Sequence, residues 1–265
     1  MQLSLLNHLR QTNPVVLNIS NFVTVQDVAN GLNAIGASPI MSEEINETKE
    51  MVSISNAVAL NLGAFSENQV KHIREMGLKA NQMGKPVVLD PVAVGAIEYR
   101  LQVAQELLEE IDVAVIRGNA GEIAALAGVN WESKGIDAGQ GQGDLVQIAQ
   151  TAAQKFRTVI LLSGEDDIIT DGERVTIVHN GTLLFAAHVG SGDMLSSIVA
   201  AFCAVSLDNF YEASRVAALV FARIGELAVG GRKQMGPGTF TVNLLDQLQL
   251  AQLDQIKQNI KFEEE

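Results

Sequence analysis

The feature that most constrains the fold of this chain is a regular alternation of two kinds of segment. Short apolar runs of strand length are followed by longer segments in which apolar residues recur at helical spacing. This alternation predicts an α/β fold with a mainly parallel central sheet and helices on both faces. The predicted strands are Val15–Ile19, a short one ending at Met41, Ala57–Leu62, Val87–Asp90, Val113–Ile116 and Val159–Leu162. The predicted helices begin near Val25 and Gly121 or span Ser66–Met83, Glu98–Glu110 and Leu145–Phe156.

The alternation of strands and helices is interrupted in the second half of the chain. Three short segments, Asp167–Thr170, Arg174–Val178 and Leu183–Ala187, are separated by Asp-Gly and Asn-Gly turns. Dipeptides of this kind connect antiparallel strands in tight hairpins. We therefore expect a short antiparallel edge beside the parallel sheet.

The last part of the chain is helical in pattern. An apolar helix is predicted from Met194, a long one over Tyr211–Val229, and an amphipathic C-terminal helix with Thr239 as its cap. The length of 265 residues suits one large α/β domain, so residues 1–265 are predicted to form a single domain. The segment Gly135–Gly143, rich in Gly and Gln, is interpreted as a surface loop.

The formal charge of −13 limits the partners of this chain. Nucleic acid and anionic membranes would be repelled by most of such a surface, so we expect neither as a partner. The acidic run Glu263–Glu265 is interpreted as a solvated tail. An anionic ligand such as ATP would need local backbone dipoles, a few cationic side chains and a metal ion, which makes Mg²⁺ the expected cofactor.

Two further patterns concern the location of the protein and its cysteine. The apolar runs, such as Ile198–Val205, fall short of the ~20 residues of a membrane-spanning helix, and Met1 begins a polar segment. We therefore expect a cytoplasmic protein. The single cysteine, Cys203, lies inside an apolar helical run and is interpreted as a buried hydrophobic residue.

The sharpest local signal is the motif Gly190-Ser191-Gly192-Asp193, directly before an apolar helix. Glycines let the backbone approach a ligand, and free N–H groups at a helix start form an anion site. A carboxylate opposes a phosphate at such a point unless it takes a proton from a substrate hydroxyl, which would make Asp193 a general base. The alternative is that Asp193 only caps the helix.

Further polar residues end neighbouring predicted strands, at the edge where ligands bind in open α/β sheets. Asp90 closes one strand, Arg117 and Glu122 follow the next, and Ser163 follows the third. Two carboxylates with water could hold Mg²⁺ between phosphates, with Arg117 as a cation for the phosphates. The alternative is structural, with Glu122 capping a short helix and Asp90 bonding a loop.

Near the N-terminus, the segment from Asn18 to Thr24 and the segment ending at Met41 follow the first two strands. They are candidate substrate-lid segments. Met41 taken alone is more often a core residue than a ligand contact.

Taken in order, a set of short motifs resembles the hydroxyethylthiazole kinase family over about residues 14 to 245. The motifs are Ile19-Ser-Asn21-x-Val23, Ala29-Asn30-Gly31, Gly36-Ala-Ser-Pro-x-Met41, Leu89-Asp-Pro-Val92, Ile116-Arg-Gly-Asn-Ala-Gly-Glu122, Gly190-x-Gly192, Met194-Leu-Ser and Gly236-Pro-Gly238. Single motifs are weak, but their joint order is highly specific.

The resemblance implies the ribokinase-like fold and phosphorylation of 4-methyl-5-(2-hydroxyethyl)thiazole by ATP with Mg²⁺, a step of thiamine biosynthesis or salvage. It also implies a homotrimer with substrate sites between subunits. By resemblance, the residues fall into three groups: Asn21, Val23, Met41 and Gly190 for the thiazole; Arg117, Asn119, Ser163 and Gly192 for ATP; and Asp90 with Glu122 for the metal.

The chain departs from the family pattern at two places. Asp193 stands where these kinases usually have cysteine, and it matches the base of the wider ribokinase-like superfamily. Residues 22–28 and Val189 replace the usual polar or threonine residues, which bears on substrate choice. A kinase of another small alcohol, such as hydroxymethylpyrimidine, is the alternative, followed by a non-catalytic binding protein on the same fold.

Overall fold

The computed structural model describes residues 1–131, 144–232 and 234–264. Nine strands form one sheet in the order β2-β1-β3-β4-β5-β6-β7-β8-β9. The pairings from β2 to β6 are parallel, and those from β6 to β9 are antiparallel. The strands are β1 (Val15–Ile19), β2 (Ser38–Met41), β3 (Ala57–Asn61), β4 (Val87–Asp90), β5 (Val115–Asn119), β6 (Val159–Ser163), β7 (Asp167–Thr170), β8 (Val175–Val178) and β9 (Phe262–Glu264).

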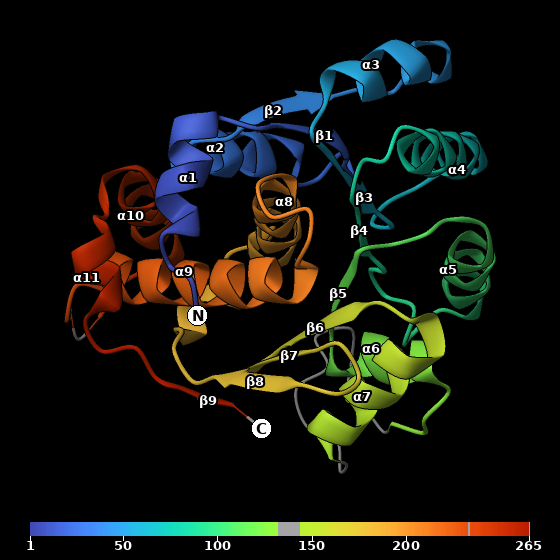
Figure 1. The fold of residues 1–265 in the computed structure, drawn as a ribbon. Helices are drawn as coiled ribbons and strands as arrows, with labels where there is room; N and C mark the ends of the chain where they lie inside the picture. Colours follow the sequence, from blue (N-terminus) through green and yellow to red (C-terminus); the bar gives the residue numbers. More distant parts are fainter. Residues whose placement is uncertain (132–143, 233, 265) are drawn as a thin grey trace.

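Helices cover both faces of this sheet (Figure 1). One face carries α1 (Leu5–Thr12), α2 (Val25–Ile35), α8 (Ser191–Ala204), α9 (Phe210–Val229), α10 (Pro237–Leu250) and α11 (Leu253–Lys257). The other carries α3 (Thr48–Ile54), α4 (Glu67–Gln82), α5 (Glu98–Glu110), α6 (Ala120–Ala127) and α7 (Leu145–Phe156). The short 3₁₀ helices are η1 (Ile45–Glu47) and η2 (Leu183–Phe185).

Each face has its own apolar core, because successive side chains of a strand point to opposite faces. In β3, Ala57 and Ala59 pack beneath α8, whereas Val58 and Leu60 belong to the core beneath α4. The strands of the parallel part are therefore apolar on both sides, as the continuous apolar runs predicted. The predicted α/β fold is confirmed, and Cys203 is fully buried in the core around α8 and α9.

Three local predictions are wrong. Leu183–Ala187 is not a strand, because the Thr182 side chain accepts a hydrogen bond from the Leu184 N–H at 3.3 Å and begins the 3₁₀ helix η2. Gly236, not Thr239, is the N-cap of α10, since Pro237 occupies the first helical position and Thr239 lies within the helix. The helix predicted from Met194 begins earlier, at Ser191.

The acidic C-terminal run is also not a free tail. Residues 262–264 form β9, which pairs with β8 along its outer edge. Glu264 forms an ion pair with Arg215 at 2.8 Å, and Glu263 lies 3.6 Å from His179. The strand therefore covers an edge that would otherwise be open to another chain.

Two other predictions concern a loop and membrane spans. The loop predicted at Gly135–Gly143 lies outside the described residues. Among the helices that are described, none combines the length and the apolar character needed to cross a bilayer.

Candidate active site

The predicted site residues lie at the carboxyl edge of the parallel strands. The register places Asn61, the last residue of β3, opposite Asp90, the last of β4. It likewise places Asn119, at the end of β5, opposite Ser163, at the end of β6. Because parallel strands end at the same edge, four polar residues from four strands share it.

Helix α8 begins at this edge, and its two glycines are needed for different reasons. Gly190 is the N-cap and has a φ of 99°, in the left-handed region that favours glycine. A Cβ at Gly192 would lie 2.3 Å from Nη1 of Arg117, so this glycine makes room for the guanidinium. The Ser191 N–H donates to the carbonyl of His188 at 3.2 Å. In the described structure this leaves the N–H groups of Gly190, Gly192 and Asp193 as the donors available to an anion.

Asp193 lies in the first turn of α8 and is held by three side chains. Its Oδ2 accepts hydrogen bonds from Nδ2 of Asn21, at 2.9 Å, and from the Thr24 hydroxyl. Its Oδ1 accepts from Nδ2 of Asn61 at 3.1 Å. The carboxylate makes no capping bond to its own helix, so the capping alternative is not what the structure shows.

Asp90 connects strand β4 to the cation of the site and to α8. It is 2% exposed, and its Oδ2 accepts from Ser196 Oγ at 2.6 Å and lies 3.4 Å from Arg117 Nη1. Nη2 of the same arginine donates to Ser163. Burial raises the pKa of Asp90 to about 7; Arg117 opposes the rise, whereas the charges of Asp193 and Glu122 add to it.

Glu122 has the structural role that was the alternative interpretation. Its two oxygens accept from the backbone N–H groups of Ala93, at 2.7 Å, and Asn119, at 2.8 Å. The Asn119 side chain accepts from the Glu122 N–H at 3.0 Å, which completes a capping box at the start of α6. Burial raises the pKa of Glu122, although these backbone bonds lower it. Each oxygen retains a second lone pair, so the capping role does not remove the carboxylate as a metal ligand.

The donor set fits a magnesium ion that is shared with phosphates. No cluster of three or more His, Cys, Asp or Glu among the described residues is arranged to hold a metal alone. Mg²⁺ in kinases is bound through one or two carboxylates together with phosphate oxygens and water. Asp90 and Glu122 lie near enough for the charge of one to raise the pKa of the other, and they supply that number of carboxylates.

The residues predicted to bind substrate differ in their surroundings. Met41 is half-buried against the core around α8, at the end of β2. Val23 is 58% exposed, and its N–H donates to Asn21 Oδ1 at 2.9 Å. Asn21 is 5% exposed, and Nδ2 of its side chain contacts Asp193. The structure therefore brings Asn21 to the predicted base, and a substrate contact for it stays a prediction.

Three contacts of the site were missed from the sequence: Thr24 and Asn61 on Asp193, and Ser196 on Asp90. Asn61 lies one residue before Leu62, where the predicted strand ended, so the rule that places polar residues at strand ends on this edge could have pointed to it. Its partner could not have been found in this way, because 132 residues separate the two side chains.

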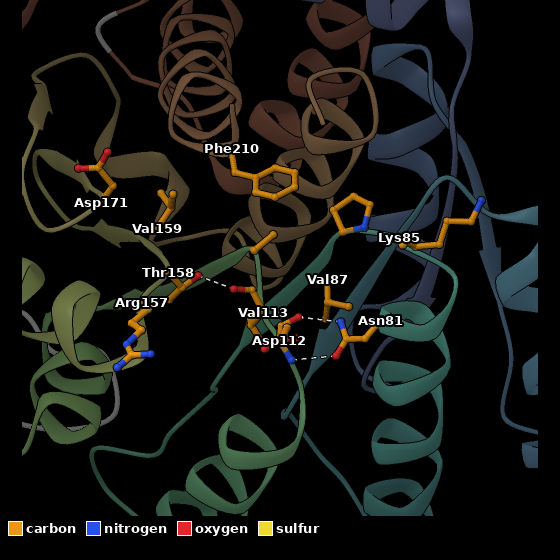
Figure 2. A pocket seen from close by; sticks show the side chains of 13 residues that line it. Asn81, Lys85, Val87, Asp112, Val113, Arg157, Thr158, Val159, Asp171 and Phe210 are labelled. Atoms are coloured by element: carbon orange, nitrogen blue, oxygen red, sulfur yellow. Dashed lines mark hydrogen bonds between the residues drawn. The ribbon is translucent and has the colours of Figure 1, made fainter. Parts of the chain in front are cut away.

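A cavity of about 440 Å³ lies at the opposite, amino edge of the parallel strands. Its lining includes Lys85, Asp112 and Arg157, and none of the predicted site residues. Figure 2 shows Asn81 bonded twice to the backbone of Asp112, with both contacts at 2.8 Å. This cavity is thus separate from Asp193 and the side chains that bond it.

Comparison with solved structures defines the class of protein. A ribokinase-like superfamily protein from Enterococcus faecalis superposes with a TM-score of 0.64 over 94% of each chain, at 14% identity, so the two share a fold. The hydroxyethylthiazole kinase of Pyrococcus horikoshii superposes with a TM-score of 0.89 at 33% identity, over 99% of this chain and 98% of its own.

The chain belongs to the hydroxyethylthiazole kinase family, whose model matches residues 6–254. It is 61% identical over 263 residues to the hydroxyethylthiazole kinase of Levilactobacillus brevis. The match covers 99% of this chain and 100% of that relative. The chain is accordingly an enzyme, a phosphotransferase of the kinase type.

Proposed function

We propose that this enzyme transfers the terminal phosphoryl group of ATP to the hydroxyl of 4-methyl-5-(2-hydroxyethyl)thiazole, a step of thiamine biosynthesis or salvage. Membership of the family supports the substrate. The observation that carries the chemistry is the Asp193 carboxylate, held by three donors at the start of α8.

In the proposed reaction Asp193 acts as the general base. It takes the proton of the thiazole hydroxyl while that oxygen forms a bond to the terminal phosphorus of ATP. The bond from phosphorus to the leaving oxygen breaks, giving thiazole phosphate and ADP. The N–H groups of Gly192 and Asp193, at the positive end of the α8 dipole, face the charge on the transferred group.

ATP is proposed to contact Arg117, Asn119, Ser163 and Gly192. Two of these residues contact each other, because the guanidinium of Arg117 donates a hydrogen bond to Ser163. Asp90 fixes the same guanidinium through an ion pair. Asp90 and Glu122 would hold Mg²⁺, which when bound neutralises charge on the phosphate oxygens. The use of ATP is also the reason for proposing the cytoplasm as the working compartment.

The thiazole is proposed to lie among Met41, Gly190 and the segment from Asn21 to Val23. Apolar side chains around this place are open in the single chain: Phe22 is 74% exposed and Val189 is 70% exposed. Exposed apolar groups beside a site are expected where another subunit covers them. They support the proposal of a homotrimer with sites between subunits.

One observation favours a second candidate substrate. Phe22 and Val189, which depart from the usual family pattern, flank the site residues Asn21 and Gly190 in the chain. These two departures bear on substrate choice, so a different small alcohol, such as hydroxymethylpyrimidine, is the second candidate.

Rates of ADP formation with Mg²⁺ test both proposals. Hydroxyethylthiazole is compared with hydroxymethylpyrimidine, pyridoxal and ribose. We expect the highest kcat/KM for hydroxyethylthiazole. Turnover on another alcohol with none on the thiazole would overturn the substrate and leave the proposed chemistry at Asp193 in place.

A further inference from the structure

We infer that Asn61 is a positioning residue that sets the orientation of the Asp193 carboxylate. The inference rests on the proposed role of Asp193 as base. Asn61 is 8% exposed and lies at the end of β3, and its Nδ2 donates to Oδ1 of Asp193 at 3.1 Å. Sequence patterns alone gave this residue no role.

The orientation of the Asn61 amide is fixed by the main chain. Its Oδ1 accepts a hydrogen bond from the Gly63 N–H at 2.8 Å. A backbone N–H can only donate, so the oxygen of the amide must face Gly63 and the NH₂ group must face Asp193. The assignment of the two amide atoms follows from this contact.

The side-chain amide of Asn21 is fixed in the same manner, and it donates to the other oxygen of the Asp193 carboxylate. Oδ1 of Asn21 accepts from the Val23 N–H at 2.9 Å, which leaves its Nδ2 as the donor. This nitrogen donates to Asn61 Oδ1 at 3.0 Å and to Asp193 Oδ2 at 2.9 Å. Each oxygen of the carboxylate therefore has its own amide donor, and the two amides are bonded to one another.

The turn at the end of β3, which carries Asn61 and Gly63, is also held by the side chain of Arg100. Nη1 of Arg100 donates to the carbonyls of Leu62, Gly63 and Val92, and the last two contacts are 2.7 and 3.2 Å. A Cβ at Gly63 would lie 2.5 Å from Nδ2 of Asn21, so only glycine lets the turn and the amide approach. The amide pair is in place before any ligand arrives.

Such preorganisation matters for a base. A carboxylate held by both oxygens cannot turn away from the substrate hydroxyl, and an orientation fixed in advance needs no adjustment as the proton moves. Among the described contacts Oδ1 of Asp193 has one donor, so it keeps a lone pair that can accept the proton of the hydroxyl. Loss of Asn61 should therefore lower kcat and leave ATP binding nearly unchanged.

The test is a double-mutant cycle. Asn61→Ala is made in the natural chain and in an Asp193→Asn background, and kcat and KM for ATP are measured with Mg²⁺ and hydroxyethylthiazole. In the natural chain we expect kcat to fall about 10- to 100-fold, with KM for ATP changed less than about twofold. In the Asp193→Asn background we expect Asn61→Ala to have little further effect, because residues that act as one unit are not additive.

Asn180 offers a matched control. It is 3% exposed, its Oδ1 accepts from the Lys261 N–H at 2.8 Å, and its Nδ2 donates to Glu226 at 3.1 Å. Asn180→Ala thus removes an equivalent buried amide away from the site. It should lower the melting temperature as Asn61→Ala does and leave kcat unchanged.

Equal losses of kcat from Asn61→Ala in both backgrounds, or none in the natural chain, would overturn the positioning role. If Asn61→Ala does not fold, Gly63→Ala tests the same pair by displacing Asn21, with the same expected split between kcat and KM. Normal turnover of Asp193→Asn alone would instead remove the base, which separates failure of the proposed function from failure of this inference.

Discussion

The two edges of the parallel sheet differ in how their polar groups are bonded. At the carboxyl edge, side chains from different elements bond one another, as Asn21, Asn61 and Asp193 do. At the amino edge there is a cavity of about 440 Å³, but its polar groups bond the nearby main chain, as Asn81 and Thr158 do. The hollow at the amino edge is therefore a weaker indication of a binding site than the side chains that converge at the carboxyl edge.

Helix direction gives the two edges opposite electrostatic character. Helices α4, α5 and α7 each end just before the next parallel strand, so the amino edge receives the negative ends of their dipoles. Helices α6 and α8 begin at the carboxyl edge and direct their positive ends there. A phosphate-bearing ligand is therefore favoured at the carboxyl edge, although the net charge of the chain is negative.

The largest expected difference between the edges is in the chemical step. Asp193→Asn should lower kcat by about two to four orders of magnitude, the usual contribution of general acid–base catalysis, with little change in KM for ATP. Asp112→Asn, at the exposed amino edge, should leave both constants unchanged. Steady-state kinetics of the two variants measures this, and a similar kcat for both would contradict the placement of the chemical step at the carboxyl edge.

A smaller loss of activity is expected when the Arg117 guanidinium, proposed to bind ATP, is displaced. Gly192→Ala places a Cβ 2.3 Å from Arg117 Nη1, so the guanidinium must leave Asp90 and Ser163. We expect kcat/KM for ATP to fall about 10- to 100-fold, since small displacements of positioning groups have effects of this size.

The control for that variant is at the amino edge. Gly84 has a φ of 65° and no atom within 4 Å of an added Cβ. Gly84→Ala should lower the free energy of unfolding by about 1–2 kcal/mol through backbone strain and leave the kinetics unchanged. Unaltered kcat/KM in Gly192→Ala would contradict the assigned place of Arg117.

The stability of the protein should also depend on pH through Asp90. Burial raises the pKa of Asp90 from 3.8 to about 7. Between these values the folded state binds more protons than the unfolded state, so the free energy of unfolding should fall as pH rises from about 4 to 7. Melting temperatures are measured from about pH 4.5 to about pH 7.5, which spans this window. They should fall less steeply with rising pH in Asp90→Asn than in the natural chain. Identical slopes would mean that Asp90 does not titrate in this range.

The smallest effect is expected from Arg157, which lines the cavity of the amino edge. It ends α7 with a φ of 53°, a left-handed conformation that suits glycine. Arg157→Gly should change the free energy of unfolding by no more than about 1 kcal/mol, because relief of strain is offset by greater freedom of the unfolded chain. KM for ATP should stay constant, and a marked rise would indicate that this cavity binds the nucleotide.

The fold could be predicted from the sequence where local pattern and tertiary packing agree. Val15–Ile19 and Glu98–Glu110 were placed to the residue, because a short apolar run marks the strand and apolar residues at helical spacing between two glutamates mark the helix. Prediction failed at Leu183–Phe185, where the Thr182 side chain begins a 3₁₀ helix in place of a strand. It also failed at β9, whose conformation depends on its pairing with β8. Such pairings join residues far apart in the chain and leave no local signal.

The site divides in the same way. Asp90 and Ser163 could be placed at the carboxyl edge because each ends a recognisable strand. The amide pair on Asp193 could not, since it depends on the spatial approach of the ends of β1 and β3 to the start of α8. The structural use of Glu122 was visible as a capping pattern, Asn119 followed three residues later by Glu122.

The proposed site is tested most directly by a crystal structure with a non-hydrolysable ATP analogue, Mg²⁺ and hydroxyethylthiazole. We expect the thiazole hydroxyl to lie within hydrogen-bond distance of the Asp193 carboxylate, with the terminal phosphate between the start of α8 and Arg117. A nucleotide bound in the cavity of the amino edge, or a hydroxyl turned away from Asp193, would contradict the proposed site.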